Sequence, residues 1–194
     1  MTIYGGSFVA GALMPHESAI VISFLLEGNR DGLLHEIEFN QQLLINNISS
    51  RKRKAMEIEK RFKNLSPAIW RYFVEKADEK ERLLLLYLAC LNTYDVLKDF
   101  HLEVIVPKYK RFSLSYDKDL FAQFLYQKTA FHVEIDEWTE NTRYKMAQVA
   151  TLMLKEIGMV KEQQIQAPNC SYSLSELLIE QHQHWFLDAI FKEY

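Results

Sequence analysis

Cysteine, glycine and proline are all scarce in this chain of 194 residues. There are two cysteines, six glycines and four prolines. Two cysteines are too few for a disulfide framework, which favours a reducing, cytoplasmic setting. So few glycines and prolines cannot supply the many tight turns of an all-β protein, and the composition therefore predicts an all-α fold with long helices.

The sequence also lacks the motifs of the common enzyme and cofactor sites. It contains no GxxxxGK[ST], no GxGxxG after a strand, no HExxH and no GxSxG sequence. The histidines are scattered, and His182 and His184 lie two positions apart, which places them on different sides of a helix and does not suit one metal ion. We therefore expect no cofactor, no metal site and no enzymatic activity.

Long apolar runs are missing as well. Leu83–Tyr94 is the longest strongly apolar run without charge, and its twelve residues are fewer than the roughly 18 to 20 that span a bilayer. No lysine or arginine precedes Arg30, so the opening of the chain lacks the basic region of a secretory signal. We expect no membrane partner and no membrane-spanning segment.

Residues 81–100 predict a helix around which the other helices assemble. Nearly every residue from Leu83 to Leu91 is apolar, and such a helix is stable in water only when other elements enclose it. Asp78 and Glu81 form a capping-box pattern at its start. We expect a compact multi-helix bundle built around this central helix.

Pro107 is expected to end any helix within a residue or two, and it divides the chain into two subdomains. These are an N-terminal helical subdomain, residues 1–106, and a C-terminal helical subdomain, residues 107–194. In the second, residues 117–167 predict a helix, a loop, a longer helix, a stop at Gly158 and a hairpin. This is the order of a winged helix, although plain packing of two helices before a loop gives the same pattern.

Positive charge is concentrated in one predicted helix, residues 50–65. Between Arg51 and Lys63 there are seven cationic and two anionic residues, although the whole chain has a net charge of −3. At about 100° per residue, the apolar side chains gather on one side of this helix and most cations on the other. A solvated surface helix is the common alternative, but such a helix usually interleaves Glu with Lys. The imbalance favours an anionic partner.

The residues that we expect to contact nucleic acid form two groups. Those on the basic helix would neutralise phosphates, and those near the start of the longer winged-helix element would add contacts in a groove. The first group is Arg51, Lys52, Arg53, Lys60 and Lys63, and the second is Arg143, Lys145 and Gln148.

A protein–protein adaptor is the rival interpretation. The basic helix would then dock on an acidic partner surface, with the aromatic helix 67–77 as an apolar anchor. The aromatic residues of that helix, Trp70, Tyr72 and Phe73, would also suit stacking on bases. At helical spacing, however, such residues more often belong to the core.

Several short segments, taken in their order and spacing, carry a resemblance to a known family. They are Tyr4–Phe8, Ala10–Leu13, Arg51–Arg53, Glu59–Phe62 with Leu65, Asp99–Phe100 and Lys155–Val160. With these segments the chain resembles the BrxA family, the small helical component of BREX phage-defence systems. The resemblance implies a NusB-like helical fold, binding of double-stranded DNA without catalysis, and action beside other BREX-system proteins. RNA binding, as in NusB, is implied by analogy of fold alone.

Overall fold

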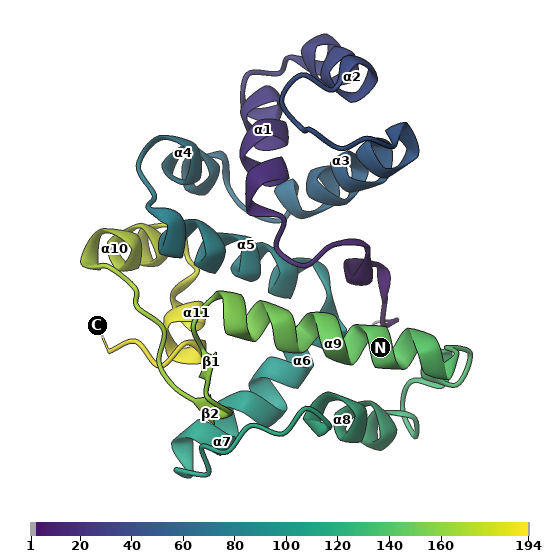
Figure 1. Ribbon diagram of the computed structural model, residues 1–194. Helices are drawn as coiled ribbons and strands as arrows, with labels where there is room; N and C mark the ends of the chain where they lie inside the picture. The colour runs from purple at the N-terminus through teal and green to yellow at the C-terminus, as the bar shows by residue number, and fades with distance from the viewer. Residues whose placement is uncertain (1–2, 194) are drawn as a thin grey trace. The chain divides into compact units, whose positions relative to one another are not determined.

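The computed structural model describes residues 3–193, and most of them are helical (Figure 1). The two strands assigned among these residues, β1 (Val160–Lys161) and β2 (Gln164–Ile165), form an antiparallel hairpin. The predicted all-α class is therefore confirmed. Contacts divide the chain into two units, residues 13–93 and a second unit that joins the residues before Leu13 to those from Tyr94 onward.

The first of these, the α1–α5 unit, is a group of helices packed around α1. Its elements are α1 (Pro15–Leu26), α2 (Arg30–Phe39), α3 (Ile48–Phe62), α4 (Pro67–Glu75) and α5 (Glu79–Thr93). Helix α1 contacts each of the other four. The side chains of Asn29, Asn47 and Ser66 accept the backbone N–H three residues later and so cap α2, α3 and α4. The cap at Asn47 explains why α3 begins before the predicted residue 50.

Helix α5 is buried on every side, as its sequence predicts. Each residue from Leu84 to Leu91 is at most 2% exposed. The predicted capping box is also confirmed. The Glu81 N–H donates to Asp78 Oδ1 at 2.9 Å, and the Asp78 N–H donates to Glu81 Oε2 at 3.1 Å. Each carboxylate thereby satisfies an amide that has no partner within the helix.

The predicted helix 81–100 is wrong in one respect, because it breaks at Tyr94. This residue is extended, with φ −128° and ψ 100°, and separates α5 from α6 (Asp95–Phe100). The Tyr94 side chain is 1% exposed, its ring centroid lies 5.6 Å from that of Phe8, and its hydroxyl accepts from Ser7 Oγ at 3.2 Å. These contacts with residues far back in the sequence offset the lost helical hydrogen bonds, and local periodicity cannot reveal them.

The second, the α6–α11 unit, contains the remaining helices and the hairpin. Its elements besides α6, β1 and β2 are η1 (Ser7–Ala10), η2 (His101–Ile105), α7 (Val106–Lys110), α8 (Leu120–Lys128), η3 (Val133–Ile135), α9 (Glu140–Glu156), α10 (Tyr172–Glu180) and α11 (His184–Ala189). Helix α9 contacts α8, β1 and η1. A Cβ atom at Gly6 would lie 3.3 Å from Met146 Sδ of α9, so the segment 3–12, which we call the N-terminal arm, approaches this helix closely.

The division between the units, at Thr93 and Tyr94, differs from the one expected at Pro107. Pro107 lies inside a helical segment that continues from Asp95 to Lys110. Just before it, η2 is a π-helix in which the Val106 N–H donates to the His101 carbonyl. A π-turn shifts the carbonyl register, so that the proline ring avoids the clash that it makes in a regular α-helix. The two helical subdomains 1–106 and 107–194 stay a prediction.

The α8–α9–hairpin order of the predicted winged-helix element is present, and a further segment joins it. The Ile165 N–H donates to the Leu114 carbonyl at 2.7 Å, and the Tyr116 N–H donates to the Gln163 carbonyl at 2.8 Å. The segment 114–116 therefore lies beside β2 as a third, short strand-like element. Helix α7, the segment 114–116, α8, α9 and the β1–β2 hairpin follow one another in the order of a winged helix. Within residues 3–193, no helix has the length and apolarity needed to cross a membrane.

Candidate nucleic-acid interface

Arg51 belongs to the interior of the α1–α5 unit, not to the exposed basic surface on which the sequence analysis placed it. Its side chain is buried, and its guanidinium donates to four backbone carbonyls around the α2–α3 connection. Two of these carbonyls belong to the last turn of α2, where the helix itself supplies no donor, and two belong to the connection that follows. The forked guanidinium satisfies them. To contact a phosphate, the Arg51 side chain would have to give up its hydrogen bonds to these carbonyls. We therefore exclude Arg51 from the interface.

Two further cations of α3 are held by carboxylates. Arg61 is 2% exposed and pairs with Glu57 at 2.8 Å. Lys54 pairs with Glu17 of α1 at 2.6 Å. Both pairs lie on the side of α3 that faces other helices of its unit. Because Glu57 neutralises its charge, Arg61 can be buried beside apolar residues. These cations stabilise the fold and do not form a binding surface.

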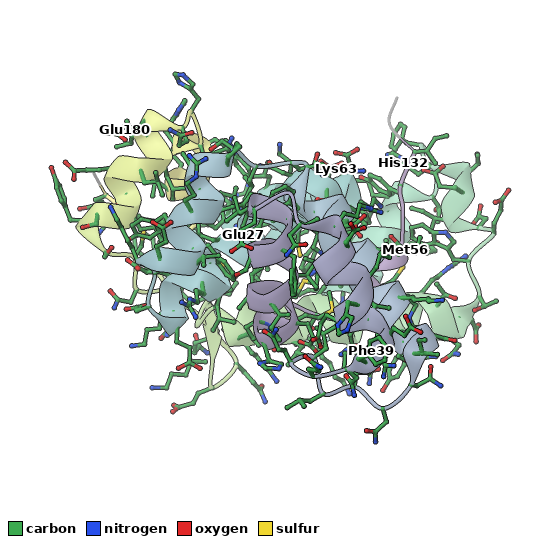
Figure 2. The ribbon with its side chains drawn as sticks, turned by 90° about the horizontal axis from the view of Figure 1, so that it is seen from above. Glu27, Phe39, Met56, Lys63, His132 and Glu180 are labelled. Atoms are coloured by element: carbon green, nitrogen blue, oxygen red, sulfur yellow. The ribbon has the colours of Figure 1, made fainter. Side chains whose placement is uncertain are left out.

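The other cations of α3 form an exposed surface, which we call the basic face: Lys52, Arg53, Lys60 and Lys63, with Met56 among them. All five side chains are exposed, and at about 100° per residue they lie within roughly 100° of the helix circumference. Met56 is 70% exposed and points away from α1 (Figure 2). Among residues 3–193, no carboxylate forms a salt bridge with Lys52, Arg53 or Lys63.

Helix α9 presents a second, less uniform surface. Thr139 caps it, because its Oγ1 accepts the Thr142 N–H at 3.2 Å. Lys145 and Gln148, two of the residues predicted to contact a groove, are exposed one turn apart on the same side. The predicted positions of both side chains at the surface therefore agree with the structure.

Arg143, the third predicted residue of α9, lies about 140° or more around the helix from Lys145 and Gln148. Its Nη2 donates to the Ile135 carbonyl at 2.8 Å and lies 3.6 Å from Asp136 Oδ1. The side chain is 33% exposed. Arg143 thus fixes the turn before α9 and lies apart from Lys145, although it lines one cavity beside α9 together with Gln148.

Two cavities beside α9 contain residues that the sequence analysis missed. Their volumes are about 610 and 470 Å³, and both are lined by Lys118, Thr151 and Lys155. Tyr144 and Gln148 line the larger one. Single lysines separated by more than thirty residues give no pattern in a sequence, so only the fold reveals that Lys118 and Lys155 are neighbours.

The predicted site residues therefore lie on two surfaces in different units. Lys52, Arg53, Lys60 and Lys63 are on α3, whereas Lys145 and Gln148 are on α9. Within residues 3–193, no group of three or more His, Cys, Asp or Glu side chains is placed to hold a metal ion. The protein is thus of an all-helical class with an exposed cationic helix face and a winged-helix order of elements.

Comparisons with known proteins identify the family of the chain. The family model described as BrxA matches residues 2–182, and the chain belongs to the BrxA family. The protein named "BREX protein BrxA" from Escherichia coli O9:H4 (strain HS) is 25% identical over 156 residues, which are 80% of this chain and 73% of that protein. The crystal structure of an uncharacterized protein from Magnetospirillum magneticum has a TM-score of 0.82 at 22% identity and covers 97% of this chain and 98% of that one. The last comparison shows a shared fold.

Proposed function

We propose that this protein is a non-catalytic, double-stranded DNA-binding component of a BREX-type phage-defence system. It would act in the cytoplasm beside other proteins of that system. Membership of the BrxA family and the name of the E. coli relative support the BREX assignment. The basic face of α3 supports DNA as the ligand.

The α3 cations are divided between the interior of the unit and one exposed face, and this division is the observation that carries the proposal. Arg51, Lys54 and Arg61 are held by carbonyls or carboxylates of the same unit, and the remaining cations gather on one exposed face. A row of exposed cations with few anions attracts a polyanion and releases its counterions on binding. Phosphate contacts of this kind position a protein but carry little sequence information, so we expect weak sequence preference.

Helix α9 would add contacts of shorter range. Lys145 and Gln148 are exposed on the longer helix of the winged-helix element, where a recognition helix meets base edges or phosphates. Lys118 and Lys155, which line the neighbouring cavities, extend the cationic surface of this unit. The two surfaces together define the DNA-binding residues of the proposal.

A double charge reversal tests the role of α3. We expect Arg53→Glu with Lys60→Glu to weaken binding to a labelled random duplex roughly 100-fold or more at low salt, because two phosphate contacts become repulsive. The matched control is Lys76→Glu with Lys80→Glu, which changes the charge of the same unit equally at exposed positions off the basic face. Circular dichroism would verify that both variants are folded.

The control should bind within about threefold of the wild type, since long-range effects of exposed charges are screened. An equal loss in both variants would show that net charge alone matters. Unchanged binding in both would exclude the basic face as the DNA surface.

An adaptor function is the second candidate, and Met56 is the observation that favours it. An exposed methionine among cations suits a protein surface with acidic and apolar residues, because the thioether adapts to irregular partners. In that case Arg53→Glu with Lys60→Glu would leave DNA binding unchanged. It would instead abolish co-purification with another protein of the defence system, as would Met56→Glu.

A further inference from the structure

Phe112 is the most exposed of the large apolar side chains in the described part of the chain. Its side chain is 88% exposed, and its backbone has a φ of +56°. Left-handed backbone is unfavourable for residues with a side chain. The position therefore carries two costs, backbone strain and an aromatic ring in water.

The strain follows from the way in which α7 ends. The Ser113 N–H donates to the Lys108 carbonyl, and the Phe112 N–H donates to the Tyr109 carbonyl, both at 2.9 Å. This pair of hydrogen bonds is a Schellman motif, in which the left-handed position is usually glycine. Glycine at residue 112 would complete the same motif without strain, so the stability of the fold does not account for phenylalanine.

A second phenylalanine of the same unit shows how such strain is ordinarily offset. Phe191 has a φ of +62°, but its ring stacks on that of Tyr109, with centroids 3.6 Å apart and planes 2° from parallel. Among residues 3–193, no aromatic ring stacks on Phe112. An exposed apolar residue with left-handed backbone also occurs at Leu44, so the surroundings of Phe112 decide whether the position has a function.

The charges around Phe112 indicate the kind of partner. Lys108 and Lys110 lie in α7, which contains no anionic residue, and Arg111 directly follows it. The side chains of Lys110 and Arg111 are exposed, and Lys108 Nζ donates to Ser113 Oγ at 3.3 Å. In the described part of the chain no carboxylate forms a salt bridge with any of the three. An exposed ring beside three cations suits a polymer that offers both phosphates and flat aromatic faces.

We infer that this turn, residues 108–112, is a further DNA contact, which we call the Phe112 tip. Its cations bind backbone phosphates, and the Phe112 ring inserts against a base step, as apolar wedges do in proteins that kink a duplex. The inference rests on the proposed function, and it adds a contact beyond α3 and α9. It also gives the exposed ring a function, contact with a base, that the neighbouring cations cannot perform.

Phe112→Gly separates this role from a structural one. We expect a thermal midpoint that is unchanged or raised by about 2 °C, since glycine tolerates the left-handed conformation. We expect an affinity for duplex DNA that is about tenfold lower, as for the loss of one stacked base. Phe112→Trp should retain the affinity, because it retains an aromatic face.

Leu44→Gly is the matched control. Leu44 is also apolar, 70% exposed and left-handed, with a φ of +55°, but it lies in the α1–α5 unit within residues 39–50, which carry no charge. This variant should bind DNA with the affinity of the wild type. A loss in both variants would point to a general effect of exposed apolar residues and overturn the inference.

A duplex that carries 2-aminopurine reports the insertion directly. The wild type should raise the fluorescence of the probe at some positions by unstacking it, and Phe112→Gly should not, even at saturating protein. Unchanged affinity of Phe112→Gly would overturn the inference while the proposed function stands. Failure of the wild type to bind any duplex would overturn both. Selective loss of binding to anionic phospholipid vesicles in Phe112→Gly, with duplex binding intact, would identify a membrane contact instead.

Discussion

Helices α3 and α9 are of similar length and have capped N-termini, yet their electrostatic settings differ. The α1–α5 unit, which contains α3, has twelve cationic and eleven anionic residues, whereas the α6–α11 unit has eleven cationic and fifteen anionic residues. The carboxylates of Glu17, Glu57 and Glu59, which lie on or beside α3, pair with cations outside the basic face. Within residues 3–193, none of them forms a salt bridge with Lys52, Arg53 or Lys63. Near α9, Asp119 and Glu140 line the same cavity as Lys118 and Lys155.

This difference assigns different physical roles to the two helices. A uniform cationic face acts at a distance and depends strongly on salt, whereas a surface of mixed charge acts only through close contacts. In the proposed DNA complex, α3 would therefore supply most of the binding free energy, and α9 would supply orientation and short-range contacts.

Replacing the exposed side chains of one helix at a time should give the largest difference in DNA affinity between α3 and α9. Replacing Lys52, Arg53, Lys60 and Lys63 together with alanine should lower DNA affinity on the order of 1,000-fold at low salt, because several phosphate contacts are lost. Lys145→Ala with Gln148→Ala should lower it about tenfold or less. Fluorescence anisotropy with one duplex measures both. A larger loss in the α9 variant would reverse the roles assigned here.

Neighbouring cations of α3 should differ sharply in their effect on stability. Arg51→Met should lower the free energy of unfolding by roughly 2–4 kcal/mol, because it removes the donor of four backbone carbonyls that are buried or partly buried. Lys52→Met should change it by less than about 0.5 kcal/mol, as usual for an exposed side chain. Urea denaturation compares the two, and equal effects would contradict the structural role of Arg51.

The two units also differ in their histidines. His101 of the α6–α11 unit is fully buried, with Nε2 2.8 Å from the Ala189 carbonyl oxygen, whereas His16 and His35 of the α1–α5 unit are exposed. Burial lowers the pKa of His101 from 6.5 to about 4. The unfolded chain therefore binds more protons than the native chain between these values, and stability falls as the pH decreases from about 6.5 towards 4.

The loss from this one group should reach about 3 kcal/mol. His101→Gln, whose side-chain amide can also reach the carbonyl, should be less dependent on pH across that range. Denaturant unfolding of both proteins at several pH values measures the difference. Parallel pH profiles would show that His101 does not cause the acid sensitivity.

The N-terminal arm gives the smallest expected effect and concerns the α6–α11 unit only. The Tyr4 hydroxyl donates to Asp99 Oδ2 at 2.6 Å, and its ring stacks on His132 with centroids 3.7 Å apart. Tyr4→Phe keeps the ring and removes the hydrogen bond, which should cost about 1–2 kcal/mol of stability. Binding of DNA through α3 should not change. A loss of affinity without a loss of stability would give the arm a direct role in binding.

Local chemistry explains what could be predicted from the sequence. The Asp78–Glu81 capping box, the unbroken burial of α5 and the exposure of Lys52, Arg53, Lys60 and Lys63 all follow from spacings within one helix. Such spacings decide which side chains share a face.

What escaped prediction depends on contacts that are distant in sequence. The break at Tyr94 requires Phe8 and Ser7. The burial of Arg51 requires carbonyls at the end of α2 and in the connection to α3, and no periodicity specifies their positions. The pairing of residues 114–116 with β2 likewise has no signal in either short segment alone. The NusB-like relationship and the binding of DNA stay predictions.

The salt dependence of duplex binding tests the central claim most directly. The affinity of the purified protein for a random duplex of about 30 base pairs would be measured from roughly 50 to 300 mM salt. The account predicts a log–log slope of about −3 to −5, because each neutralised phosphate contributes near −0.9. No binding at the lowest salt, or binding that does not change with salt, would contradict the claim that the basic face of α3 meets DNA.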